Sequence, residues 1–174
     1  MSVRGSGYIG AAFDRKEVRK IIQSFKECVK DKIWGDFDTI ACLGTSGLVI
    51  APILALQFNK KLLVVRKDKD NSHANGRLEG HDDGKKYIVV DDFICSGATL
   101  ENIVTTIKDE FYKWYSEPPT YIGCYFWTLG YREVSQKVKM PISRYQKLCK
   151  NKVFAQRIDG VKKYGIDTYV EPND

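Results

Sequence analysis

The most constraining feature of the sequence is a series of short apolar runs separated by longer segments of different character. The runs cover residues 38–43, 61–65, 86–90 and 121–127. Each is short and nearly continuous in apolar residues, which is typical of strands buried on both faces of a sheet. Strands separated by helices or long loops are expected to be parallel, with right-handed crossovers. The sequence therefore predicts an α/β fold: three layers, doubly wound, around a mainly parallel central sheet.

Helical patterns lie between these runs. Residues 14–33 carry an apolar stripe, and Asp14 is placed to cap its start. A second helix is expected to extend to about Phe58, with Pro52 in its first turn. A third follows residue 97, with one apolar face that extends from Leu100 to Trp114. Residues after 130 alternate only weakly and support no assignment.

Composition narrows the class of protein. With 174 residues, 43% hydrophobic and 29% charged, the chain resembles one globular domain. No apolar stretch approaches about 18 residues, and no signal pattern opens the sequence, so we expect a cytoplasmic protein. The net charge of +6 fits either nucleic acid or a polyanionic small molecule. Without a basic-aromatic RNA-recognition signature, we favour the small molecule.

The five cysteines are scattered, and no Cys-x-x-Cys pair occurs among them. We expect reduced, buried thiols. A zinc site needs closely spaced ligands, and His73 and His81 offer no such pairing. The sequence therefore gives no indication of a structural metal centre.

Three unusual loops follow the expected strands, at residues 44–47, 66–86 and 91–97. The second is polar and long enough to be functional, and it has room for a short hairpin. In parallel sheets, ligands bind at the carboxyl ends of strands. Because all three loops begin at those ends, we expect them to converge on one crevice.

The loop at 91–97 has the residues of a sugar-phosphate site. Its small residues and the helix that follows can direct backbone N–H groups at a phosphate, and Ser96 and Thr99 add hydroxyls. Asp91 and Asp92 would repel that phosphate but suit ribose hydroxyls or a metal ion. The alternative is structural: Asp92 and Ser96 cap the loop, and Asp91 is a solvated strand end.

The run from Tyr87 to Thr99 resembles the motif that binds 5-phosphoribosyl-1-pyrophosphate (PRPP) in the type I phosphoribosyltransferases. That motif is an apolar strand, two acids, three variable residues, then Thr-Gly-small-Thr. This chain departs from it at Ser96, which keeps the hydroxyl of the usual threonine. The loops at 44–47 and 66–86 stand where the family has its pyrophosphate loop and its mobile catalytic loop, so the resemblance covers about residues 38–128.

The resemblance implies a magnesium-dependent transferase that moves the 5-phosphoribosyl group of PRPP to a nitrogenous base. In it, Asp91 and Asp92 bind the ribose hydroxyls, with Mg²⁺ between pyrophosphate and ribose oxygens and these aspartates as its direct or indirect protein ligands. The implied 5-phosphate site is Cys95, Ser96, Gly97, Ala98 and Thr99, the implied pyrophosphate site is Gly44, Thr45, Ser46 and Gly47, and the implied catalytic cations are Arg66, Lys67, Lys69 and His73.

The base is left open by the resemblance. The pair Arg66-Lys67 resembles orotate enzymes, but Glu101 stands where those enzymes have an arginine for the substrate carboxylate. Hypoxanthine-guanine enzymes carry a base-stacking aromatic beyond the fourth strand, which makes Trp127 a candidate here. As a strand aromatic, Trp127 can equally belong to the core.

The resemblance also implies an arrangement of the whole chain. We expect residues 1–174 to form one domain, with a core at about 38–128 and a small hood from residues 1–37 and 131–174, and we expect a homodimer. Two alternatives to the enzyme remain. One is a non-catalytic regulator that binds PRPP or nucleotides, with nucleic acid as a further partner. The other is an unrelated doubly wound domain that accepts phosphate in signalling, although no phosphoacceptor aspartate stands out.

Overall fold

The computed structural model describes residues 9–67, 76–115, 117–128, 138–157 and 168–171. Its strands are β1 (Thr39–Leu43), β2 (Lys61–Val65), β3 (Leu78–Gly80), β4 (Lys86–Asp91), β5 (Thr120–Phe126), β6 (Val138–Pro141), β7 (Val153–Gln156) and β8 (Thr168–Glu171). Its helices are the short 3₁₀ helix η1 (Ile9–Phe13), α1 (Arg15–Lys30), α2 (Gly44–Leu48), α3 (Ala51–Gln57), α4 (Ala98–Trp114) and α5 (Ile142–Leu148).

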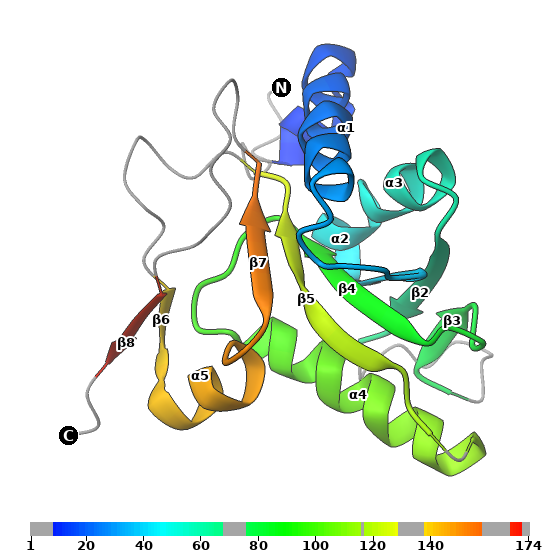
Figure 1. Ribbon diagram of the computed structural model, residues 1–174, viewed down its shortest axis with the longest axis vertical. Coiled ribbons are helices and arrows are strands. Elements are labelled where there is room, and N and C mark those ends of the chain that lie inside the picture. Colours follow the sequence, from blue (N-terminus) through cyan, green and yellow to red (C-terminus); the bar gives the residue numbers. More distant parts are fainter. Residues whose placement is uncertain (1–8, 68–75, 116, 129–137, 158–167, 172–174) are drawn as a thin grey trace, which may run out of the picture.

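A six-stranded sheet forms the centre of the molecule, in the order β3-β2-β1-β4-β5-β7. Neighbouring strands are parallel except for the pair β2 and β3. Helices α1, α2 and α3 lie on one face, and α4 and α5 lie on the other (Figure 1). The expected three-layer, mainly parallel α/β fold is confirmed. A separate parallel pair, β6 and β8, lies beside this sheet.

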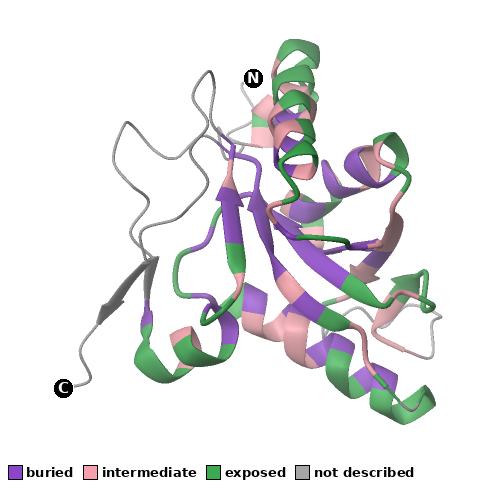
Figure 2. Cartoon of the chain, viewed as in Figure 1, coloured by how far each residue is buried: buried purple, intermediate pink, exposed green. Residues whose placement is uncertain are grey.

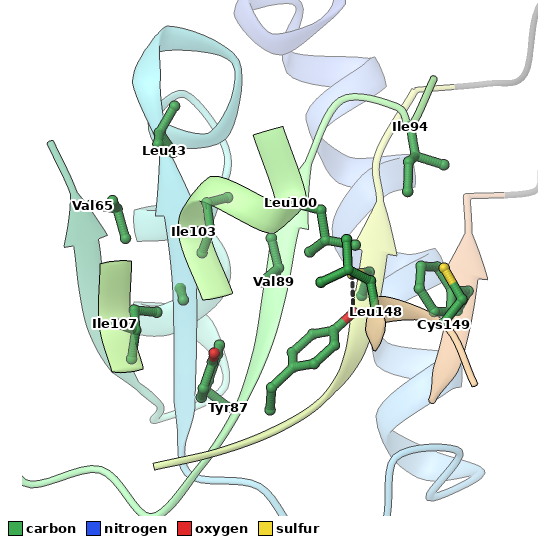
Figure 3. Packing of buried hydrophobic residues seen from close by; sticks show 14 of the residues in the cluster. Leu43, Val65, Tyr87, Val89, Ile94, Leu100, Ile103, Ile107, Leu148 and Cys149 are labelled. Carbon is green, nitrogen blue, oxygen red and sulfur yellow. Dashed lines mark hydrogen bonds between the residues drawn. The ribbon is translucent and has the colours of Figure 1, made fainter. Parts of the chain in front are cut away.

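The pleat of β4 explains why its sequence is apolar without alternation. Tyr87 and Val89 belong to the hydrophobic cluster on the α4 side, whereas Ile88 and Val90 belong to the cluster on the α1 and α3 side. Successive side chains point to opposite faces of a strand, so a strand covered on both faces must be apolar throughout. Figure 2 shows the central strands as largely buried, and Figure 3 shows Val89 packed near Leu100 and Ile103.

The helix expected at residues 14–33 is α1, and Asp14 caps it as predicted. The Asp14 carboxylate accepts hydrogen bonds from the backbone N–H groups of Lys16 (2.8 Å) and Glu17 (3.0 Å). These bonds satisfy two donors that have no partner within the helix. The apolar stripe of α1 is buried on the sheet, where Phe25 is fully inaccessible.

The described parts of the two terminal segments contact the main sheet. In the described part of residues 1–37, α1 packs on the sheet. In the described part of residues 131–174, β7 pairs with β5 and forms an outer strand of the main sheet. Both segments carry apolar side chains that only the sheet can bury, and this requirement explains their placement. The division of the whole chain into one core and one hood stays a prediction.

The secondary structure of residues 44–58 and 66–86 differs in detail from what the sequence predicts. Residues 44–47, expected as an open loop, form most of the single helical turn α2, and α3 begins anew with Pro52 in its first turn. Within 66–86, β3 pairs antiparallel with β2, which confirms the short hairpin. In the described part of the chain, no helix is long and apolar enough to cross a membrane.

All five cysteines are free, as expected. Four of them are buried, and their side chains fill the two hydrophobic clusters. Cys95 is the exception to the expected burial, since it is exposed in the loop between β4 and α4. That loop lies at the carboxyl edge of the sheet, where the site is built.

Candidate functional site

The segments that follow β1, β2 and β4 meet at the carboxyl edge of the sheet, because these three strands are adjacent and parallel. Together they line a cavity of about 420 Å³. Its walls include Lys67, Asp91, Asp92 and the runs 44–46 and 95–99. The structure thus brings residues from all three predicted loops into one crevice.

Two buried carboxylates form the centre of the cavity. Asp91 and Asp92 are 6% and 7% exposed, at the end of β4. The Asp91 carboxylate accepts hydrogen bonds from the Ser46 hydroxyl (3.0 Å) and from the backbone N–H of Asp92 (2.9 Å). The Asp92 carboxylate accepts one from the backbone N–H of Phe93 (2.8 Å). Asp91 is therefore not the solvated strand end of the structural alternative.

Burial, and after it repulsion by the adjacent carboxylate of Asp92, raises the pKa of Asp91 to about 7. Hydrogen-bond donors of a sugar, or a cation, would relieve this penalty. Magnesium in proteins usually takes one or two carboxylates and completes its coordination with water and substrate phosphate oxygens. In the described part of the chain, no three acidic, histidine or cysteine side chains gather as a metal site. The two aspartates fit an ion that the substrate also holds.

The loop 95–99 forms one wall of the cavity and leads directly into α4. Gly97 has the left-handed conformation (φ 73°) just before the first residue of the helix. The Ser96 hydroxyl accepts a hydrogen bond of 3.4 Å from the backbone N–H of Ala98. A long helix that begins beside a cavity directs its free N–H groups and its positive dipole end at an anion. The geometry suits a phosphate at this wall.

The opposite wall consists of the turn after β1. Gly44 has a positive φ of 64°, and an added Cβ there would lie 3.1 Å from Cε of Lys67. The ammonium of Lys67, at the end of β2, therefore lies next to the backbone of this turn. A cation beside exposed backbone N–H groups provides a second place for an anion.

Other predicted residues lie outside the cavity walls. Gly47 is buried against β1 and β4, where an added Cβ would lie 2.8 Å from the Cβ of Cys42, so its small size serves packing. The Arg66 side chain pairs with Glu79 (3.3 Å) and lines a neighbouring groove instead. Lys69 and His73 lie outside the described residues.

The prediction that Trp127 stacks on a base requires correction. Trp127 is completely buried in the cluster that α1 and α3 cover, and its indole N–H donates to the carbonyl oxygen of Ser46 (3.0 Å). A side chain with no exposed face cannot stack on a ligand. Its contact with Ser46 instead supports the turn after β1 from behind.

The structure also adds residues that the sequence patterns did not single out. Ile9 of η1 and Phe93 of the loop after β4 line the cavity, and Phe93 is 38% exposed. Glu101, in the first turn of α4, pairs with Arg144 (2.6 Å) and Lys147 (3.2 Å) of α5. These partners are more than 40 positions apart, and residues after 130 gave no assignment that could have predicted the pairing.

Comparison with known proteins places this site in context. A family model described as phosphoribosyl transferase domain matches residues 12–113, more than half of the chain. An orotate phosphoribosyltransferase of Archaeoglobus fulgidus is 37% identical over 75 residues, which cover 42% of each chain. The transcriptional regulator GfcR of Methanocaldococcus jannaschii is 27% identical over 81 residues, which cover 42% of this chain and 38% of the regulator. The chain therefore spans less than half the length of these relatives.

Solved structures give a longer match. The crystal structure of an adenine phosphoribosyltransferase from Thermoanaerobacter pseudethanolicus superposes with a TM-score of 0.58 and covers 90% of this chain and 88% of that one. The sequence identity in this superposition is 15%. At such identity the likeness concerns the fold alone.

Proposed function

The chain belongs to the phosphoribosyltransferase family, and we propose that it transfers the 5-phosphoribosyl group of PRPP to a nitrogenous base and releases pyrophosphate. The observation that carries this proposal is the cavity itself, whose walls combine two buried carboxylates with two runs suited to anions. PRPP has a phosphate at one end, a pyrophosphate at the other and ribose hydroxyls between them. Its charges and hydrogen-bond donors are complementary to those walls.

We assign each wall a part of the substrate. The loop 95–99 would bind the 5-phosphate, and the run 44–46 with Lys67 would bind the pyrophosphate. Asp91 and Asp92 would accept hydrogen bonds from the ribose hydroxyls. The same carboxylates would help to hold Mg²⁺, which when bound supplies positive charge to the pyrophosphate oxygens.

The proposed reaction needs positioning more than covalent chemistry. The bond between ribose C1 and the pyrophosphate oxygen breaks, and its electron pair leaves with pyrophosphate. A lone pair of the base nitrogen forms the new bond to C1, and the proton of that nitrogen is released to solvent. Negative charge grows on the pyrophosphate as the bond breaks, so the ammonium of Lys67 would stabilise the transition state more than the ground state.

The base remains open in this proposal. Glu101 carries negative charge where an orotate carboxylate would need a cation, although Arg144 and Lys147 compensate that charge. Phe93, an exposed aromatic at the cavity wall, replaces Trp127 as our candidate for contact with a base. Either a purine or a pyrimidine is compatible with these residues.

A second candidate function is a regulator that binds PRPP or a nucleotide without turnover. The similarity to the regulator GfcR favours it, as does the net charge of +6. Such a protein would bind nucleic acid with an affinity that falls steeply as salt rises. The enzyme remains our first proposal. The cavity has two walls suited to anions, and it also has the Lys67 ammonium, which would stabilise the leaving pyrophosphate.

The proposal is tested by incubating the protein with PRPP, MgCl₂ and a panel of purine and pyrimidine bases, with pyrophosphate release as the measurement. We expect release with one base or a related group of bases, and none without Mg²⁺. The double variant Asp91→Asn, Asp92→Asn should bind no PRPP while keeping the wild-type circular dichroism spectrum. Absence of release with every base, together with tight PRPP binding, would favour the regulator instead.

We further propose that the protein acts as a homodimer in the cytoplasm. Family resemblance supports the dimer. Analytical ultracentrifugation of the pure protein over a wide range of protein concentrations would test the assembly. A monomer across that range would contradict it.

A further inference from the structure

Helix α5 lies against the outer side of the loop that the proposed function assigns to the 5-phosphate. In Figure 1, α5 lies beside α4, and the structure packs the two helices together. An added Cβ on Gly97 would lie 2.9 Å from Cε of Met140 and 3.3 Å from Cδ of Arg144. The segment 140–148 thus supports the loop by direct contact, although it is distant in sequence.

Arg144 makes a specific bond within this contact. Its Nη1 donates to the carbonyl oxygen of Ser96 at 3.0 Å, and its Nε donates to the Glu101 carboxylate at 2.6 Å. One planar guanidinium therefore joins the loop to the first turn of α4. Lys147 reaches the other oxygen of Glu101 at 3.2 Å, and of these two described side chains it is Arg144 that bonds to Ser96.

The bond to Ser96 has a consequence for the neighbouring N–H. In a planar trans peptide, the C=O of one residue and the N–H of the next point in opposite directions. Ser96 and Gly97 line the cavity, whereas Arg144 is not among the residues of its wall. A Ser96 carbonyl held outward by Arg144 therefore directs the Gly97 N–H toward the cavity. The guanidinium also keeps the carbonyl dipole away from the anion.

We propose that Arg144 is a positioning residue for the binding of a sugar phosphate: it fixes the Ser96–Gly97 peptide so that the loop presents N–H groups to the phosphate. Glu101 holds the guanidinium in place, and the hydrogen bonds that its carboxylate accepts from Arg144 and then Lys147 lower the pKa of Glu101. This inference rests on the proposed function only in taking the loop as the 5-phosphate site. It requires no particular base and no turnover.

The test measures binding of ribose 5-phosphate by isothermal titration calorimetry to wild-type protein and to three variants. Arg144→Gln removes the Ser96 bond and one charge. Lys147→Gln is the matched control, since it removes the same charge from the same helix and the same Glu101 but leaves the Ser96 bond intact. Arg144→Lys keeps the charge but cannot hold both partners with a planar fork. Thermal unfolding of each variant verifies the fold.

We expect Arg144→Gln to weaken binding of ribose 5-phosphate by about tenfold or more, as for loss of a charge-assisted hydrogen bond. Lys147→Gln should change it by less than about twofold, and Arg144→Lys should lie between. Equal losses in Arg144→Gln and Lys147→Gln would overturn the inference, because general electrostatics would then explain both. Unchanged binding in Arg144→Gln, or wild-type protein that binds no ribose 5-phosphate, would also overturn it.

The two proposals can fail separately in this design. If the wild-type protein binds ribose 5-phosphate but releases no pyrophosphate with any base, the transferase proposal fails and the expected order of variants still supports the role of Arg144. If the wild-type protein turns over PRPP but Arg144→Gln binds ribose 5-phosphate normally, the role of Arg144 fails and the transferase stands.

Discussion

Asp91 lies where its negative charge is costly, and the cost is connected to its proposed role. Its carboxylate is buried beside that of Asp92, and burial first, then this neighbour, raises its pKa to about 7 from 3.8. A site that attracts ribose hydroxyls and a cation needs such acceptors out of water, since water would compete for them. At pH 7 the protein is therefore less stable than it would be with an uncharged side chain at position 91.

The pH dependence of stability follows from this shift. Between about pH 4 and pH 7 the folded chain keeps the Asp91 proton, whereas the unfolded chain has lost it. The stability contributed by this group is thus complete below about pH 4 and is lost as pH rises toward 7. The loss should reach up to about 4 kcal/mol, at about 1.4 kcal/mol for each unit of pKa. Urea unfolding of wild type and Asp91→Asn from pH 4 to pH 8 measures it.

Asp91→Asn should reduce the fall in the free energy of unfolding between pH 4 and pH 8, because asparagine stays neutral at every pH. The control is Asp109→Asn, the same chemical change at an exposed position of α4, which should keep the wild-type slope. An Asp91→Asn protein whose free energy of unfolding declines as steeply as that of wild type would contradict the assignment of this proton to Asp91.

Gly97 shows how an element depends on one backbone conformation. The turn that starts α4 requires φ of 73° at this residue, and a Cβ there would lie 2.9 Å from Cε of Met140, which would have to shift. Gly97→Ala should destabilise the fold by about 2–3 kcal/mol, from left-handed strain and the contact with Met140. Gly35→Ala separates the two causes, because Gly35 has φ of 66° with open space around it and should cost about 1 kcal/mol. Equal losses of unfolding free energy in Gly97→Ala and Gly35→Ala, measured by chemical denaturation, would refute the contribution of the Met140 contact.

Lys67 follows β2 and contacts the turn after β1, so a substitution of Lys67 tests the proposed role of that turn. In the proposed reaction, Lys67→Gln should lower kcat/KM by about 10- to 100-fold, because the cation acts on charge that grows in the transition state. Lys61→Gln is the matched control at the other end of the same strand, where Lys61 pairs with Asp83 (2.6 Å) far from the cavity. A Lys67→Gln enzyme with wild-type kcat/KM for PRPP would remove the cation from the mechanism.

Elements with local signals were predictable, and those held by distant contacts were not. The apolar runs of β1, β2 and β4 and the apolar stripe of α1 are visible in the sequence alone. The structure has these strands within one residue of the predicted bounds and α1 within three. Trp127 could not be placed by pattern, since an aromatic at a strand end looks the same whether it faces core or crevice. Burial on the α1 side decides this, and burial depends on the packed fold.

The carboxyl-terminal part of the molecule depends on contacts across the whole chain. β7 borders β5, and α5 borders the loop before α4, yet neither has a strong period of its own. Their positions come from partners such as Trp34, whose indole N–H donates to the carbonyl oxygen of Val153 at 2.9 Å. This bond spans 119 positions, so no local pattern indicates it. The pairing of Arg144 with Glu101 was beyond prediction for the same reason.

Arg157 joins α1 to the outer strand β7 of the main sheet, and this contact gives the prediction for the molecule as a whole. Its side chain is 1% exposed at the end of β7, and its Nη2 lies 2.7 Å from the carboxylate of Glu17 on α1. Arg157→Met should keep the volume but remove the charge-assisted hydrogen bond to Glu17, which costs about 1.5–3 kcal/mol. Lys20 pairs with the same Glu17 at 2.9 Å but is 52% exposed, so Lys20→Met should cost under about 0.5 kcal/mol. Urea denaturation of both variants compares them directly.

Because α1 and β7 lie away from the proposed substrate contacts, PRPP affinity should stay within about twofold of wild type in both. Similar losses of unfolding free energy in the two variants would mean that the pair of Arg157 and Glu17 does not hold α1 and β7 together.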